Sequence, residues 1–313
     1  MAVRKDTAVS VIIVNYNAGH YLLDAVQSVL AQTRVDLEVI VVDNASTDDS
    51  LAAVRALSND KRTITIVEIG YNSGFAHGCN AGLKAASGRH ILFLNPDCVL
   101  SANSVSRLSR FLEKNAKASM VGPLILGPDG REQAGCRRDI PSPFQVGCVL
   151  LGIHKLLPNH PRFRHFNHTQ RPLPKGATIV QAVSGACMMV RAADLKKFGA
   201  FDESYFLHFE DIDLCLRLTQ DGRDIFFLPT VEVLHHKGVS SQHRPVFVNW
   251  HKHRSLIRFF RKNFWEFYPK AVLAGLSAII YLHFLATVPL ALMPRRRRTS
   301  VSGWDILTDG NTD

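Results

Sequence analysis

Residues 9–17 read VSVIIVNYN, a β-branched and apolar run that ends in polar residues. Such a run is typical of a strand that is buried on both faces of its sheet. A helical pattern follows at Tyr21–Gln32, and a second apolar run at Leu37–Val42 predicts another buried strand. Strand, helix and strand in this order indicate a right-handed crossover between parallel strands. The stretch therefore predicts an α/β fold with a mostly parallel central sheet flanked by helices.

The same alternation continues along the chain. Strands are expected at Thr63–Ile69 and Ile91–Leu94, with a helix at Ala76–Ala86 between them. After an irregular, arginine-rich region at 127–175, the expected elements are a strand-like segment at Ile179–Arg191, a short helix at Ala192–Phe198, a helix that begins near Glu210, a strand at Ile225–Leu228 and a last strand that ends at His235 and His236. An irregular stretch as long as 127–175 is typical of a loop region that lies over a binding site.

The chain has 313 residues, enough for one large α/β domain with additions or for two small domains. Because 46% of the residues are apolar and 20% are charged, wholesale disorder is excluded. The net charge of +10 is regional, since residues 240–300 hold eleven basic residues against the single Glu266. No nucleic acid partner is expected, because a long apolar run in the same region favours an anionic membrane surface. The six cysteines form no Cys-x-x-Cys pair, which favours a reducing compartment.

Polar clusters close three predicted strands, at the carboxyl ends where open α/β sheets bind their ligands. One such cluster alone is equally well explained by a helix cap or a turn, but several together favour a binding site. The candidates are Asn15, Tyr16 and Asn17 after the first strand, Asp43, Asn44 and Asp48 after the second, Asn72, Gly74 and Phe75 after the third, and Asn95 and Asp97 after the fourth. No dinucleotide fingerprint follows the first strand, and the chain contains no P-loop motif.

This predicted edge is acidic, although a phosphate site is usually basic. A carboxylate and a diphosphate become compatible when a divalent cation lies between them. Asp97 is the expected ligand of that cation, and a nucleoside diphosphate is its natural second ligand.

Five motifs in this order resemble the family 2 inverting glycosyltransferases of GT-A fold. They are VIIVNYN at 11–17, VVDNASTD at 41–48, NSGFA at 72–76 with Asn80, LNPD at 94–97 and FEDIDL at 209–214. The Asn-Pro-Asp form is most similar to bacterial rhamnosyltransferases that extend lipid-linked cell-surface glycans. The resemblance covers residues 9–241. It implies a nucleotide-sugar donor, dTDP-rhamnose or a UDP-linked sugar, and a lipid-linked saccharide acceptor.

The resemblance also implies roles for individual residues. Asp43 would bind the nucleotide base, and Asp48 with the backbone of residues 15–17 would line the same pocket. Asp97 ends the motif that family members usually write Asp-x-Asp, so it would hold Mg²⁺ or Mn²⁺ against the diphosphate. Asn95 replaces the first aspartate and is expected to contact sugar or ribose. Related enzymes place a histidine that is a further metal ligand at the position of His235 or His236, and His235 fits the spacing slightly better.

The acidic motif at Glu210 and Asp211 would supply the catalytic base. In an inverting displacement, a carboxylate takes the proton of the acceptor hydroxyl while its oxygen attacks the anomeric carbon. We assign this role to Asp211, with Glu210 beside it, although acidic residues also suit a helix N-terminus. Asp213 and Arg217 are four residues apart and are expected to pair on the helix surface. The loop arginines Arg137 and Arg138 are candidates for assisting the leaving group, while most arginines there are expected on a solvated face.

The C-terminal region has a different character. Residues 249–263 predict a basic amphipathic helix of the kind that lies in a membrane interface. Residues 271–293 carry no formal charge and would be long enough as a helix to span a bilayer, but His283 and Pro289 weaken a span. A spanning helix and a half-inserted or surface-lying helix stay open, with a soluble core helix as a third alternative. Basic residues at 295–298 follow.

The sequence thus predicts three parts: a GT-A glycosyltransferase domain at 1–241, a membrane-associating helical segment at 242–298 and a flexible tail at 299–313. The enzyme is expected at the cytoplasmic face of the inner or plasma membrane. A nucleotidyltransferase and a non-catalytic nucleotide-sugar binder are the alternatives. The first would bring an early glycine-rich phosphate loop, which residues 15–20 do not form, and the second would not need Asp211.

Overall fold

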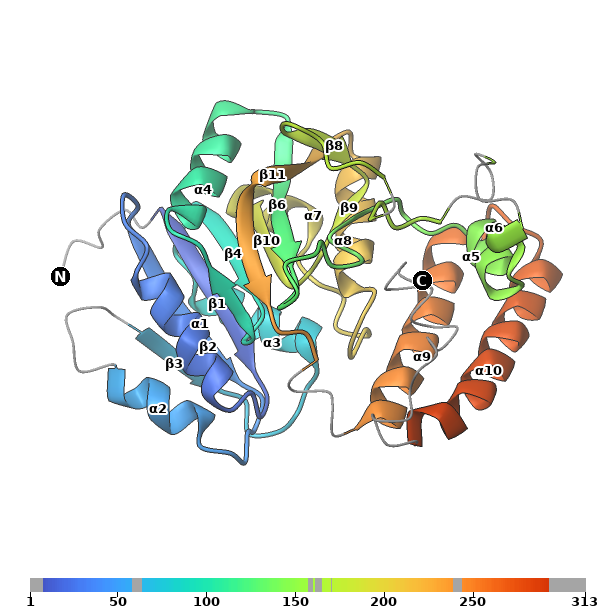
Figure 1. The fold of residues 1–313 in the computed structure, drawn as a ribbon, viewed down its shortest axis with the longest axis horizontal. Coiled ribbons are helices and arrows are strands. Elements are labelled where there is room, and N and C mark those ends of the chain that lie inside the picture. Colours follow the sequence, from blue (N-terminus) through green and yellow to red (C-terminus); the bar gives the residue numbers. More distant parts are fainter. Residues whose placement is uncertain are drawn as a thin grey trace.

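The computed structural model describes residues 8–57, 64–156, 160, 165–169, 171–238 and 244–292. Its centre is a nine-stranded sheet in which eight strands follow the order β3-β2-β1-β4-β10-β6-β11-β5, while β8 pairs with β11. Helices pack against this sheet, and a separate group of helices lies beside it (Figure 1). The predicted α/β class is confirmed.

The first four strands form a parallel half. β1 (Val9–Asn15) lies between β2 (Leu37–Asp43) and β4 (His90–Leu94), and β3 (Ile64–Glu68) extends the sheet beyond β2. All residues of β1 and β4 are buried, which explains why both segments are almost continuously apolar. The crossover helices are α1 (His20–Leu30), α2 (Ser50–Leu57) and α3 (Phe75–Ala85).

The other half mixes strand directions. β10 runs antiparallel to both β4 and β6, whereas β11 is parallel to β6 and antiparallel to β5 and β8. A small ribbon, β7 with β9, stands apart. The elements are β5 (Cys98–Leu100), α4 (Ser104–Lys114), β6 (Ala118–Leu126), β7 (Arg137–Arg138), β8 (Thr178–Val180), β9 (Ala182–Val183), β10 (Cys187–Arg191), α7 (Ala192–Phe198), α8 (Glu210–Gln220) and β11 (Asp224–His235).

Two local expectations were wrong. The two strands expected before His235 are one strand, β11, whose pairing with β6 shifts register between Leu228 and Glu232. Pro229 lies in that interval and has no backbone N–H to donate, which accounts for the irregularity. Asp213 does pair with Arg217, with Nε 3.0 Å from Oδ2, but Asp213 is fully buried and not on the surface.

The remaining helices form a second unit beside the sheet, at the right of Figure 1. They are α5 (Pro143–Leu150), α6 (Ile153–Leu156), α9 (Pro245–Phe264) and α10 (Lys270–Leu292). α9 and α10 contain the predicted basic and apolar helices, and residues 293–313 lie outside the described chain. A second apolar core joins Leu256 and Phe259 of α9 and Ile280 of α10 to Tyr205 and Ile212 near the start of α8.

Candidate active site

A cavity of about 370 Å³ lies at the carboxyl ends of the parallel strands, between the sheet and α9. The predicted site residues that line it are Tyr16, Asn44, Asn72, Gly74, Phe75, Asn95, Asp97, Glu210, Asp211 and His235. Residues separated by more than 190 positions therefore share one cavity. The predicted residues outside this lining are Asn15, Asn17, Asp43, Asp48 and His236.

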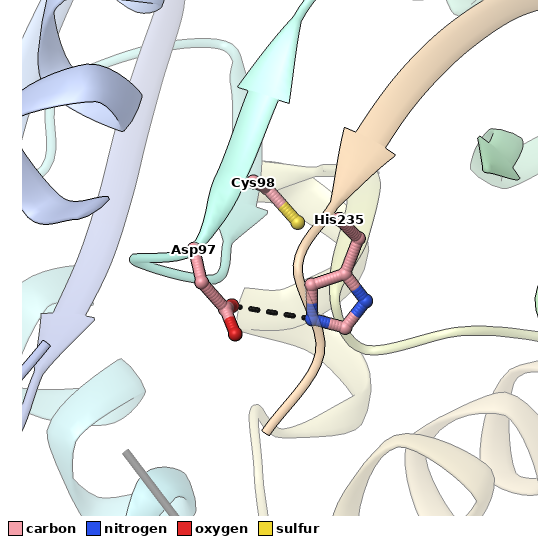
Figure 2. Close-up of side chains that lie close together, drawn as sticks. All are labelled: Asp97, Cys98 and His235. Carbon is pink, nitrogen blue, oxygen red and sulfur yellow. Dashed lines mark ion pairs between the residues drawn. The ribbon is translucent and has the colours of Figure 1, made fainter. Parts of the chain in front are cut away.

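Asp97 and His235 face each other in this cavity (Figure 2). Asp97 follows β4 and His235 ends β11, and their Oδ1 and Nε2 atoms are 3.2 Å apart. Both side chains are nearly buried. Together with Cys98 they form a group whose possible ligand atoms all lie within 4.8 Å of one another. The Asp97 carboxylate suits Mg²⁺ or Mn²⁺, and Mn²⁺ accepts the His235 imidazole more readily than Mg²⁺ does, so the donor set fits a divalent cation.

A hydrogen bond fixes the orientation of His235. Its Nδ1 donates to Oε1 of Gln133 at 2.8 Å, and Nε2 of Gln133 donates to the His235 backbone carbonyl at 2.7 Å. These bonds leave Nε2 directed at Asp97 and suited to bind a metal ion. His236 differs: its ring packs on Tyr21 at 4.8 Å between centroids, and its backbone N–H donates to the Asp97 carbonyl. Of the two histidines, His235 is the one at Asp97.

Cys98 belongs to the same group by distance but not by chemistry. Its thiol donates to the Ala186 carbonyl, with Sγ 3.4 Å from the oxygen. Burial, followed by the charge of Asp97, raises the pKa of this thiol well above its ordinary value. A protonated thiol is a poor ligand, and Mg²⁺ and Mn²⁺ prefer oxygen.

The polar residues that close β1 and β2 bind mostly one another. Nδ2 of Asn15 donates to Oδ1 of Asp43 and to Oγ of Ser46 and Ser50, each at 2.9 Å. The other Asp43 oxygen accepts the Ser46 N–H at 3.0 Å. Asp48 similarly accepts the Gly19 N–H at 2.8 Å. This network holds the two strand ends together behind the cavity.

The segment after β3 approaches the cavity through a glycine. Gly74 has φ 86°, and a Cβ placed there would lie 2.4 Å from the Phe206 carbonyl oxygen. The adjacent Phe75 N–H donates to that same oxygen at 2.9 Å. Nδ2 of Asn44 donates to the Gly74 carbonyl at 3.0 Å. Only glycine combines this backbone conformation with this close approach.

Glu210 and Asp211 begin α8 and face the same cavity. Oδ2 of Asp211 accepts the Gly185 N–H at 3.0 Å and pairs with the Arg138 guanidinium, while Oδ1 accepts the Ile212 N–H at 2.8 Å. Glu210 is also buried, and its Oε2 makes no hydrogen bond to the described residues. Burial, with a further contribution from the charge of Asp211, raises the pKa of the Glu210 carboxyl. The position of the Asp211 carboxylate is therefore fixed by more hydrogen bonds than that of the Glu210 carboxylate.

The two loop arginines have different partners. Arg138 lines the cavity and contacts Asp211, whereas Arg137 forms a bidentate pair with Glu132, at 2.8 and 3.0 Å. Both are largely buried, in contrast to the solvated face expected for most arginines of that loop. Arg162 and Arg164 lie outside the described residues. Arg138 is thus the one of the two that reaches the acidic pair.

The backbone is strained immediately before α8, and the sequence analysis did not predict this strain. His208 and Phe209 have φ values of 67° and 72°, and both line the cavity. Two successive non-glycine residues in this region cost free energy, and such strain concentrates at functional sites. The strained turn aims Glu210 and Asp211 at the cavity. No side-chain pattern in the sequence signals it.

Charges behind the site tie α8 to α9. Buried Asp213 accepts from Lys262, with Nζ 2.8 Å from Oδ1, as well as from Arg217. Lys262 and Arg258 also pair with Asp202, at 2.9 and 3.0 Å. Because Lys262 belongs to α9 and Asp213 to α8, the helix that lines one wall of the cavity is bonded to the helix that carries the acidic pair.

Comparison with known proteins agrees with this geometry. The family model described as glycosyl transferase family 2 matches residues 10–198. The chain is 28% identical over 312 residues to an N-acetylglucosaminyl-diphospho-decaprenol L-rhamnosyltransferase of Mycobacterium tuberculosis, a match that covers 94% of this chain and 97% of that protein. It is 24% identical over 234 residues to the low-salt glycan biosynthesis hexosyltransferase Agl10 of Haloferax volcanii, covering 74% and 67%.

Solved structures share the fold at low identity. GalNAc-T7 with UDP, GalNAc and Mn²⁺ gives a TM-score of 0.60 at 15% identity and covers 93% of this chain and 52% of that chain. The mannosyltransferase PcManGT from Pyrobaculum calidifontis, with GDP-Man and Mn²⁺, gives 0.56 at 19%, covering 97% and 79%. These likenesses confirm the GT-A fold. Since the family model spans more than half of its residues, the chain belongs to glycosyl transferase family 2.

Proposed function

We propose that this glycosyltransferase moves rhamnose from dTDP-rhamnose, with inversion, to a saccharide that a diphosphate links to a lipid. The observation that carries the proposal is one cavity that contains both Asp97 with His235 and Glu210 with Asp211. The Asn-Pro-Asp motif and the mycobacterial relative support rhamnose and a diphospholipid acceptor.

Asp97 and His235 would hold Mg²⁺ or Mn²⁺. Such an ion offsets the negative charge that develops on a departing diphosphate. Asn95 lies next to this pair, with Nδ2 3.4 Å from Nε2 of His235, and we place it against the sugar or ribose of the donor. Asp43 and Asn15 would fix the strand ends against which the nucleotide base lies, with Tyr16 as a wall of that pocket.

Asp211 would act as the base. The acceptor hydroxyl oxygen bonds to the anomeric carbon, the carbon–oxygen bond to the diphosphate breaks, and its electron pair leaves with the diphosphate. The hydroxyl proton passes to the Asp211 carboxylate. Arg138 and the Gly185 N–H hold this carboxylate, so its direction is set before substrate binds.

Exchange of Asp211 for asparagine tests the proposal. Asp211→Asn keeps the shape and removes the basic oxygen, so we expect kcat to fall about 10³-fold. Affinity for dTDP-rhamnose, measured by the shift in Tm with added nucleotide sugar and Mn²⁺, should change less than twofold. A variant that retains full transfer would exclude Asp211 as the base. A screen of other nucleotide sugars by the same shift would test the donor.

We further propose that the helical segment at 242–298 docks on the cytoplasmic surface of an anionic membrane. Among the described residues, one helix, Lys270–Pro289, is long and apolar enough to cross a bilayer. One face of α10 packs through Leu273, Leu276 and Ile280 into the second core, and Leu282 and Leu285 on its other side are exposed. This one-sided packing favours a helix that lies in the interface over one that spans.

A surface change tests docking without dismantling the fold. Removing α9 would strip Asp213 of Lys262, so truncation confuses docking with unfolding. Phe267 and Leu282 are instead 77% and 65% exposed. A protein with Phe267→Ser and Leu282→Ser should pellet with phosphatidylglycerol vesicles several-fold less than the wild type. The control is Ile179→Ser, because Ile179 is exposed on β8 in the sheet part. Equal pelleting of all three would contradict docking through these helices.

A further inference from the structure

The wall of the cavity formed by α9 has a cation at the centre of an apolar strip. Val248, Lys252 and Leu256 line the cavity at four-residue spacing, so they lie on one face of α9. Phe247 and Arg244 line it at the start of the same helix. Acidic residues are absent from α9, which runs from Pro245 to Phe264.

Other cations reach the same region from separate elements. Lys237 follows β11 and Arg138 belongs to β7, and both line the cavity with Lys252. His208 lines the same cavity. Burial first, and then the charges of Lys252, Arg138 and Lys237, lower the pKa of this histidine well below its ordinary value. Arg138 is paired with Asp211, so Lys252 and Lys237 are cations of this lining that the acidic pair does not engage in the contacts described above.

This part of the wall has no role in binding the donor as proposed above. The donor diphosphate would meet the metal group at Asp97 and His235, which lies at the strand ends. A second anion in an acidic cavity needs cations of its own, because carboxylates repel it. The apolar neighbours Val146 and Phe166, which belong to α5 and the loop beyond it, suit a hydrocarbon chain at the same wall.

We propose that Lys252, supported by Lys237 and His208, binds the diphosphate of a lipid-linked acceptor, and that Val248 and Leu256 contact the first part of its lipid chain. The inference rests on the proposed function and specifies its acceptor site. It places the acceptor sugar between Lys252 and Asp211, with its diphosphate toward α9. An ammonium group in a partly desolvated wall binds a phosphate oxygen strongly.

Geranyl diphosphate, which carries the proposed anion and a short chain but no sugar, provides the test. Isothermal titration into the full-length protein is done with EDTA, so that the metal-dependent donor site does not bind the probe. We expect Lys252→Ala to weaken binding about tenfold. The matched control is Arg254→Ala on the same helix, which is exposed and does not line the cavity and should change Kd less than twofold. Thermal unfolding verifies that both variants fold.

Three results would overturn the inference: no binding of geranyl diphosphate by the wild type at millimolar concentration, equal weakening by the two variants, or the same loss for a neutral geranyl glucoside. The assay involves no donor and no turnover, so it is separable from the proposed reaction. Should the enzyme prove to transfer sugar, Lys252→Ala should raise KM for a diphosphate-linked acceptor about tenfold and leave the donor KM unchanged.

Discussion

The two walls of the cavity are built in opposite ways. At the strand ends, the wall is backed by a network in which the Asn15 amide donates to Asp43 and Ser46, and the Ser46 N–H donates to Asp43. On the α9 wall, Val248 and Leu256 flank Lys252, and positive charge stands among apolar side chains. The first wall suits a polar ligand of constant shape, and the second suits an amphiphile. Within one cavity, the proposed donor site would therefore bind through polar contacts and a metal ion, whereas the proposed acceptor site would combine a cation with apolar contacts.

The walls also differ in their relation to the family. The family model matches residues 10–198, which contain the strand-end wall apart from His235, whereas α8, β11 and α9 follow that range. The part that identifies the family is therefore the proposed donor side. The part that would select the acceptor comes later in the chain, apart from α5.

The largest expected effect falls on the strand-end wall. Asp97→Ala removes the one carboxylate of the Asp97, Cys98 and His235 group. We expect kcat/KM to fall about 10³-fold, because charge stabilisation of the leaving group is lost. The remaining activity should no longer rise with added Mn²⁺, measured as initial rates across a Mn²⁺ titration.

Cys98→Ala is the matched control for that change. Its thiol donates to the Ala186 carbonyl and is not an expected ligand. Loss of one buried sulfur should lower Tm slightly and leave the Mn²⁺ titration unchanged. If Cys98→Ala and Asp97→Ala alter the titration equally, the assignment of the ligand set is wrong.

The next effect concerns the link between the walls. Asp213→Ala leaves Lys262 and Arg217 without their shared buried carboxylate, so the free energy of unfolding should fall by about 3 kcal/mol. Urea denaturation measures this change. Asp202→Ala, at a more exposed carboxylate that pairs with Arg258 and Lys262, should cost about 1 kcal/mol. Equal decreases in the free energy of unfolding for the two variants would show that the buried Asp213 pairs stabilise the fold no more than the exposed Asp202 pairs.

A smaller change displaces the proposed base itself. A Cβ at Gly185 would lie 3.1 Å from Cβ of Asp211 and 3.3 Å from Oδ2, which forces a shift of a few tenths of an ångström. Gly185→Ala should therefore lower kcat about tenfold with donor KM unchanged. Gly176→Ala is the control, because a Cβ there meets nothing within 4 Å. Unaltered kcat for Gly185→Ala would mean that the position of Asp211 does not limit the rate.

The smallest effect is a pH dependence on the helical side. Burial lowers the pKa of His253 from 6.5 to about 4. Between pH 6.5 and about 4, His253 binds a proton in the unfolded chain but stays neutral in the folded chain. Its contribution to the free energy of unfolding is therefore fully present at neutral pH and declines as the pH falls toward 4. Between pH 7.5 and 5.5 the free energy of unfolding should drop by about 1 kcal/mol from this residue. In His253→Gln this part of the decline should vanish, and identical pH profiles for the two proteins would contradict it.

Much of the fold was predictable because its signals are local. Buried parallel strands are almost continuously apolar, so the sequence predicts β1, β2 and β4 directly. The mixed half was harder, since β5, β6 and α4 were not assigned, and β11 was divided in two at Pro229. Strand direction in that half depends on distant partners, which no local pattern encodes.

The candidate site divides in the same way. Motifs located Asp97, Glu210 and Asp211, because each follows a recognisable strand or begins a helix. The contact of Arg138 with Asp211 and the strained turn at His208 depend on tertiary packing and could not be predicted. The His235 ring is oriented toward Asp97 by its hydrogen bond to Gln133, which is about a hundred positions away in the chain. No local pattern predicts this contact.

The ion pairs of Arg258 and Lys262 with Asp202 and Asp213 limit how this enzyme can be re-engineered. A chimera that imports the last two helices of another glycosyltransferase would lose both cations, leaving Asp202 without them and Asp213 with Arg217 alone. A viable graft has to exchange both carboxylates with their cations, or replace all four with apolar residues that fill the same volume.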